Sequence, residues 1–275
     1  MNIYKILTEI EKTDPEVYDK LGSRREVFKH FAGFGKKLAV AAVPLAFGSM
    51  FKKAYGQTSG GLIGILNYAL TLEYLEAEFY TMAVAKAPGG SAGFIPSGEP
   101  IGAITTIRDH ENAHVNFLKS AITAAGGTPA AKPTFDFSAG NGSNNGPFAD
   151  VFTNYQTFLA VAQAFEDTGV RAYKGQADKI TDNAVLTAAL QIHSVEARHA
   201  AHIRRMRGQK GWITGKDGGN MPAATQAVYN GEENTNQAGV NVATLPGSSV
   251  NIGTEAFDEP LDMNVVLAIV DPFIV

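Results

Sequence analysis

The sequence predicts an all-α protein, built as a four-helix bundle with a long crossover between its second and third helices. Four Ala-rich segments place apolar residues at helical spacing. The connections between them are short, long and short, which is typical of two antiparallel helical hairpins. A chemical pattern also occurs twice, because a helix carrying Glu-x6-Tyr precedes a helix carrying Glu-x-x-His in both halves.

Turn and cap residues set the expected helix boundaries. Pro88-Gly89-Gly90 stops the first helix, and Gly126-Gly127 closes the second. Residues 128–147 are rich in Pro, Gly and Asn, and a connection this long is expected to cross from one end of the bundle to the other. The expected helices span residues 62–86, 103–125, 149–177 and 182–208.

The organisation predicted for the chain has three parts: an N-terminal helical segment (1–56), the bundle (57–208) and an irregular C-terminal extension (209–275). The extension is rich in Gly, Asn, Thr and Pro, but it also carries scattered aromatic residues such as Trp212 and Tyr229. A disordered tail would carry fewer such anchors. We therefore expect an ordered extension that wraps the bundle or a neighbouring subunit.

The N-terminal segment contains a pattern that resembles a twin-arginine export signal. Arg24-Arg25 is followed by Lys29, by an apolar stretch over residues 38–51, and by a small-x-small site at Ala54-Tyr55-Gly56. Val27 stands where Phe is usual. The pattern predicts a periplasmic or otherwise exported protein. The alternative is a cytoplasmic protein that keeps this segment as a basic amphipathic helix, packed on the bundle or on a membrane surface.

The bulk composition excludes several classes of function. A formal net charge of −4 and a pI near 5.9 leave no basic surface, so we expect no nucleic-acid partner. The absence of cysteine excludes disulfides, iron–sulfur clusters and thiolate zinc sites. No uninterrupted apolar run of about 18 residues is present to span a membrane.

The repeated pattern predicts a metal site inside the bundle. A spacing of three places the Glu and the His of each Glu-x-x-His pair on one helical face. One Glu from each of two helices and one such pair from each of the others is the arrangement of di-iron and di-manganese carboxylate proteins. Four carboxylates balance two divalent ions, and an oxygen-rich ligand set suits iron, with manganese as the alternative. The predicted ligands are Glu73, Glu111, His114, Glu166, Glu196 and His199.

Several neighbouring residues are candidates to support the ligands. The two tyrosines could donate hydrogen bonds to ligating carboxylates, although core aromatics would look the same in sequence. Glu76 could replace or supplement Glu73, and Asp167 competes with Glu166, which the apolar stripe favours. The three histidines lie one turn from ligands and could instead be plain surface residues. The complete supporting set is Tyr80, Tyr173, Glu76, His110, His193 and His202.

At these residues the chain resembles the ferritin-like superfamily, and more narrowly its bacterial branch related to plant desiccation-related proteins. The segments that carry the resemblance are Leu72-Glu73-Tyr74-Leu75-Glu76-Ala77-Glu78-Phe79-Tyr80, both Glu-x-x-His pairs, and the tail segments 229–235 and 255–261. The resemblance covers residues 23–275 and implies a bundle whose dinuclear centre meets O2 or H2O2. In the plant relatives the ligand set is partly eroded, whereas here all six positions are filled. The long loops and tail depart from cage-forming ferritins.

Three functions follow as hypotheses. The first is a di-iron oxidoreductase that oxidises Fe(II) or reduces O2 or H2O2, of the ferroxidase or peroxide-scavenging type, with no catalytic residues beyond the metal ligands. The second is a manganese catalase-like enzyme that disproportionates H2O2. The third is a non-catalytic stress or desiccation-related protein with a structural metal site. The sequence indicates no separate pocket for an organic substrate, and we expect a homo-oligomer.

Overall fold

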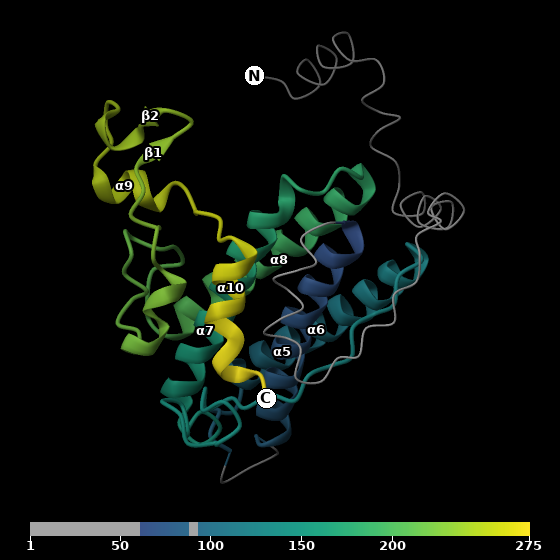
Figure 1. The fold of residues 1–275 in the computed structure, drawn as a ribbon. Helices are drawn as coiled ribbons and strands as arrows, with labels where there is room; N and C mark the ends of the chain where they lie inside the picture. The colour runs from purple at the N-terminus through teal and green to yellow at the C-terminus, as the bar shows by residue number, and fades with distance from the viewer. Residues whose placement is uncertain (1–60, 88–92) are drawn as a thin grey trace, which may run out of the picture.

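The bundle predicted from the sequence is present. The structure, a computed structural model, describes residues 61–87 and 93–275; the N-terminal segment 1–56, with its twin-arginine-like pattern, lies outside the described residues. Helix α5 packs along α6, and α7 packs along α8, so two helical hairpins face each other (Figure 1). The all-α prediction is confirmed. The four long helices are α5 (Leu62–Ala85), α6 (Glu99–Ala124), α7 (Tyr155–Ala177) and α8 (Asn183–Met206).

Glycines end two of these helices, and for α6 the sequence predicted this closure. Gly126 has a φ of 79°, a left-handed conformation that favours glycine, and its amide donates to the carbonyl of Thr123. Gly127 donates in turn to the carbonyl of Ile122. The same pair of hydrogen bonds closes α8 at Gly208 and Gln209. These bonds satisfy carbonyls that would otherwise lack partners at the helix ends.

Two predicted helix starts are wrong. The third helix begins at Tyr155 rather than at 149, because the side chain of Asn154 accepts hydrogen bonds from the amides of Gln156 and Thr157 and so caps the helix there. Residues 149–153 form turns instead. The second helix begins at Glu99, four residues earlier than predicted, because Pro100 occupies a first-turn position where its missing N–H costs nothing.

The two ends of the bundle core are packed differently. At one end aromatic rings fill the interior around Phe79, whose ring lies 4.9 Å from that of Phe158 and 5.1 Å from that of Phe165, measured between ring centroids. The other end is lined mainly by aliphatic residues such as Leu66, Leu118 and Ile192. The buried carboxylates lie between these two ends of the core.

The crossover from α6 to α7, residues 125–154, is organised by one buried carboxylate. The side chain of Asp136 accepts hydrogen bonds from the amides of Ser138, Gly142 and Asn144 at 2.9–3.0 Å. Backbone hydrogen bonds tie this region to the last part of the chain, including one of 2.8 Å from the Asp136 amide to the carbonyl of Phe273. The crossover therefore carries no helix of its own but is fully ordered by local and long-range bonds.

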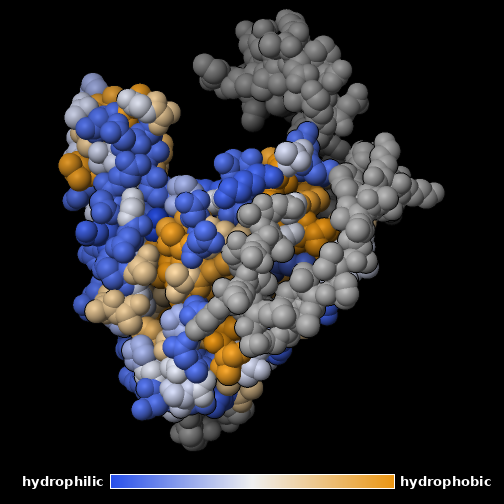
Figure 2. Space-filling model, in the orientation of Figure 1, coloured by the Kyte–Doolittle hydropathy of each residue, from blue (hydrophilic) through white to orange (hydrophobic). Residues whose placement is uncertain are grey.

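The C-terminal extension runs back over α7 in short elements. Figure 1 shows α10 lying across α7. The small hairpin β1–β2 and α9 form a lobe that projects away from the bundle, with the hairpin at its far end. On the face drawn in Figure 2 this lobe is mostly hydrophilic, and hydrophobic residues gather nearer the bundle. The elements are η1 (Ala223–Val228), β1 (Asn236–Gln237), β2 (Val240–Asn241), η2 (Val242–Thr244), α9 (Val250–Glu255), α10 (Met263–Val270) and η3 (Asp271–Phe273).

A buried arginine anchors this extension. The guanidinium of Arg171, on α7, lies 2.8 Å from a carboxylate oxygen of Glu232. It also donates to the backbone carbonyls of Val228, Asn230 and Glu259. Both side chains of the ion pair are 1% exposed. One bundle residue thus holds two separate segments of the tail, residues 228–232 and Glu259. Among the described residues, no helix has the length and apolar character needed to cross a membrane.

Candidate metal centre

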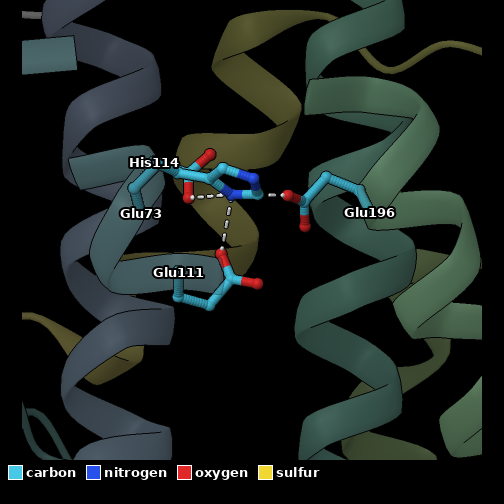
Figure 3. Close-up of side chains that lie close together, drawn as sticks. All are labelled: Glu73, Glu111, His114 and Glu196. Atoms are coloured by element: carbon cyan, nitrogen blue, oxygen red, sulfur yellow. Dashed lines mark hydrogen bonds and ion pairs between the residues drawn. The ribbon is translucent and has the colours of Figure 1, made fainter. Parts of the chain in front are cut away.

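The six predicted ligands converge in the middle of the bundle. Helix α5 contributes Glu73 and α7 contributes Glu166, while α6 and α8 contribute the two Glu-x-x-His pairs. All four glutamates are completely buried and His199 is 5% exposed. Figure 3 shows Glu73, Glu111 and Glu196 directed at the imidazole of His114 from three different helices. The helical spacing seen in the sequence is what aims these side chains inward.

Two four-residue groups make up the cluster. The first comprises Glu73, Glu111, His114 and Glu196, and the second comprises Glu111, Glu166, Glu196 and His199. Within each group, one potential ligand atom per residue lies within 4.8 Å of every other. Because Glu111 and Glu196 belong to both groups, two adjacent ions could share them as bridges. Each ion would then have three carboxylates and one imidazole.

The distances between these ligand atoms are those of groups that meet at common points. Nδ1 of His114 lies 3.1 Å from an oxygen of Glu73, 3.2 Å from one of Glu111 and 3.1 Å from one of Glu196. Nδ1 of His199 lies 2.8 Å from Glu111 and 3.3 Å from Glu166. Each imidazole is therefore surrounded by carboxylates on the side that faces the interior.

Unsatisfied atoms test whether this cluster fits metal ions. Both carboxylate oxygens of Glu196, one oxygen each of Glu111 and Glu166, and Nδ1 of His199 are buried and make no well-aligned hydrogen bond, although several of them lie at ion-pair distance from one another. Orphaned buried polar atoms are rare in folded proteins because each costs free energy. Cations coordinated by these oxygens and nitrogens would satisfy them. The donor set, six carboxylate and imidazole side chains, is the kind that iron and manganese take. The residues of both groups fit metal ions.

The two predicted tyrosines hold the two carboxylates that are not shared. The hydroxyl of Tyr80 donates to Glu166 at 2.5 Å, and the hydroxyl of Tyr173 donates to Glu73. Each tyrosine comes from the opposite hairpin to its glutamate. These bonds orient the end ligands and leave their second oxygens facing the centre.

Replacing either tyrosine with phenylalanine is expected to weaken metal binding by about tenfold to a hundredfold. The carboxylate then loses the hydrogen bond that sets its direction. Competition with a coloured chelator measures the affinity. Tyr155→Phe, at the start of α7, is the matched control and should bind as the wild type does. Equal affinity in Tyr80→Phe, Tyr173→Phe and wild type would contradict the positioning role.

Only one of the three predicted supporting histidines reaches the cluster. Nδ1 of His110 lies 2.9 Å from Nε2 of His199, so the two rings are hydrogen-bonded. This bond holds the ring of His199 with its Nδ1 directed at the carboxylates. His110 itself is exposed. His202 instead lies 3.4 Å from Glu99 at the surface. His193 lies outside both ligand groups, near Lys174 and Asp258.

The structure separates the carboxylates that sequence left open. Glu73 belongs to a ligand group and Glu76 does not, although Glu76 is also buried. A Cβ atom at Gly169 would stand 3.3 Å from an oxygen of Glu76 and 3.3 Å from an oxygen of Glu196, so a side chain at this position would crowd both carboxylates. Asp167 turns away and pairs with Arg204 at 2.5 Å. Sequence reasoning missed Gly169. An isolated glycine inside an apolar helical pattern was the signal that could have found it.

Crowding of buried carboxylates determines the protonation of the metal-free cluster. Burial raises the pKa of Glu111 to about 7 and that of Glu196 well above its usual range, and neighbouring carboxylates add to the effect at Glu196. Burial alone would lower the pKa of each histidine, but the carboxylates outweigh it and raise that of His199 to about 11 and that of His114 further. Protons thus take the place of cations.

Metal binding is therefore expected to release protons. At pH 7 both imidazoles are protonated and Glu111 is partly so, and the raised pKa of Glu196 favours its protonated form. Each protonated group must lose its proton to bind a metal, so two ions displace more than two protons and the affinity falls as the pH is lowered. Calorimetric titration with Mn(II) in two buffers of different ionisation enthalpy counts these protons. A pH-independent affinity between pH 6 and 8 would contradict this assignment of charges.

Comparison with known proteins adds one positive finding. A family model described as a ferritin-like domain matches residues 61–209, more than half of the chain. A search of curated proteins found no match to the chain. The matched range contains all four bundle helices and all six residues of the two ligand groups.

Proposed function

Because the chain belongs to the ferritin-like family, we propose that it is a di-iron carboxylate protein that oxidises Fe(II) with O2 or H2O2. The observation that carries the proposal is the pair of buried four-residue groups sharing Glu111 and Glu196. A single-ion site would need only one such group. The sharing of two carboxylates favours two ions held close enough to act together on one oxidant.

Each residue has a role in this proposal. Glu73 and His114 would hold one ion, Glu166 and His199 the other, and Glu111 and Glu196 would bridge them. When bound, a pair of Fe(II) ions supplies two electrons, one from each ion, which with two protons convert O2 to H2O2 or H2O2 to two molecules of water.

The rest of the chain prepares the site for this chemistry. Complete burial of the four glutamates excludes bulk water and strengthens the electrostatic attraction between carboxylates and cations. Tyr80 and Tyr173 hold the end carboxylates in place from opposite hairpins, so little reorganisation is needed when ions enter. His110 gives the cluster a hydrogen-bonded connection to the surface through His199.

Anaerobic titration with Fe(II) followed by exposure to O2 or H2O2 tests the function. We expect saturation at about two ions per chain and, after mixing with oxidant, absorbance changes of ferric iron within seconds to minutes. Glu78→Gln is the matched control, since Glu78 lies on the same helix but pairs with Lys132 at the surface. Failure to bind Fe(II) would refute the proposal. Binding that stabilises the bundle without any oxidation would favour a structural metal instead.

A manganese enzyme is the second candidate, because the same oxygen-rich donor set suits that metal equally well. Metal analysis of protein purified from its own host without chelators distinguishes the two. About two iron ions per chain would support the di-iron proposal. Manganese at that ratio, together with O2 release from H2O2, would replace it with a catalase-like function.

A further inference from the structure

An apolar cavity of about 30 Å³ lies inside the bundle at its aliphatic end. All four bundle helices contribute to its wall, together with Ile180 from the turn between α7 and α8. The sequence indicated no separate substrate pocket, and this cavity is too small for most organic substrates. We propose that it holds molecular oxygen and delivers it to the metal pair from the side of Glu73; the delivery step rests on the proposed function.

The cavity adjoins the metal centre. Tyr173 lines it and also donates its hydroxyl hydrogen bond to Glu73. Leu72, which lines the cavity, directly precedes Glu73, and Ile192 lies about one helical turn before Glu196. The helical turns that line the cavity therefore also carry metal ligands or the tyrosine that holds one of them.

The size and chemistry of the cavity select its occupant. A volume of about 30 Å³ has room for about two water-sized spheres, which matches a diatomic molecule. No charged side chain lines it, and its wall is almost wholly apolar although Tyr68, Tyr173 and Gln176 contribute to the lining. Water in a cavity needs two to four polar partners, and H2O2 has the same requirement as a polar hydrogen-bonding molecule. O2 is apolar and needs no polar partners.

Aromatic rings fill the opposite end of the bundle. There the rings of Phe79, Phe158 and Phe165 pack face to face and edge to face. A polar approach exists on a different side, where exposed His110 meets His199. Ions and peroxide are suited to that hydrated side, whereas O2 partitions into the aliphatic end. The two kinds of reactant would thus reach the centre by separate routes.

Oxygen binding can be tested on metal-free protein, without any turnover. Dissolved O2 is paramagnetic and accelerates the relaxation of nearby methyl protons. Under raised O2 pressure we expect strong enhancement at the methyl groups of Leu118, Val185 and Ile192, which line the cavity, and weak enhancement at Val161, which is buried in the packed core. Enhancement at the cavity no greater than at Val161 would overturn the proposal.

Filling the cavity tests delivery. Ala188→Leu places a larger side chain in the cavity, and Ala121→Leu does so from another helix in case the first variant does not fold. Ala184→Leu, on the same helix but outside the cavity wall, is the control. The filling variants should lose the methyl enhancement and oxidise Fe(II) with O2 about tenfold more slowly, with the H2O2 rate changed less than about twofold.

The outcomes separate this inference from the proposed function. If both oxidant rates fall together in a filling variant that melts as the wild type does, the metal centre is disturbed and delivery through the cavity is wrong. If wild type oxidises no Fe(II) with either oxidant, the proposed function and the delivery step fail together. The relaxation measurement still decides whether the cavity binds O2.

Discussion

Replacing Glu196 with glutamine is expected to abolish binding of the metal pair while leaving the metal-free bundle as stable as before. Glu196 belongs to both ligand groups, so its loss removes a ligand from each ion. In the metal-free protein burial, Glu111 and Glu73 raise its pKa well above the usual range, which favours the uncharged carboxyl group. A neutral amide of the same shape should change the free energy of unfolding by less than about 1 kcal/mol.

Thermal unfolding with and without metal separates these two effects. With ligand at about 100 times its Kd, binding stabilises the wild type by about 2.7 kcal/mol. For a chain of this size that raises Tm by roughly 5–10 °C. Glu196→Gln should show no such rise, and Glu78→Gln should show all of it. A metal-dependent rise in Glu196→Gln equal to that of wild type would remove Glu196 from the site.

The second large effect is expected at Arg171. Substitution by methionine keeps much of the side-chain volume but leaves Glu232 buried without its cation and three tail carbonyls without their donor. Removing one partner of a buried ion pair costs about 3–5 kcal/mol. We therefore expect Tm to fall by roughly 6–20 °C, and the extension after α8 to become sensitive to proteases.

Lys174→Met is the matched control for Arg171→Met. Lys174 is also on α7 and also pairs with a tail residue, Asp258, but both side chains of this pair are partly exposed. Such a pair contributes about 0–1 kcal/mol. The double variant Arg171→Met with Glu232→Gln should recover part of the lost stability, because it removes the unpaired buried charge. Equal Tm values for Arg171→Met and Lys174→Met would show that the anchor has little effect.

The metal cluster could be predicted because its determinants are local. Glu111 and His114 are three residues apart, and any helix places such a pair on one face. The choice of Glu166 over Asp167 also followed from the apolar stripe of α7. The family model and the helices of the structure confirm the ferritin-like bundle that these patterns indicated.

Long-range partners could not be predicted in the same way. Arg171 and Glu232 are far apart in sequence, and neither lies in a pattern that names the other. His110, His193 and His202 all lie about one turn from a ligand, yet only His110 contacts one, because the angle around the helix decides this. The apolar cavity is a space between side chains and leaves no trace in composition. The start of α7 at Tyr155, by contrast, could have been predicted, because Asn154 just before it is a typical helix-capping residue that is visible in the sequence.

The anchor at Arg171 also has a consequence for the order of events during synthesis. Its nearest tail partner, the carbonyl of Val228, is 57 residues further along the chain, and the carbonyl of Glu259 is 88 residues away. All four bundle helices are synthesised before Glu232 is added to the chain. Until then the guanidinium must stay hydrated, so the outer face of α7 remains open to water while the hairpins are already able to pair. The nascent bundle therefore exposes the charged group of Arg171, and a chaperone or a misfolded segment can bind this face of α7 before the tail covers it.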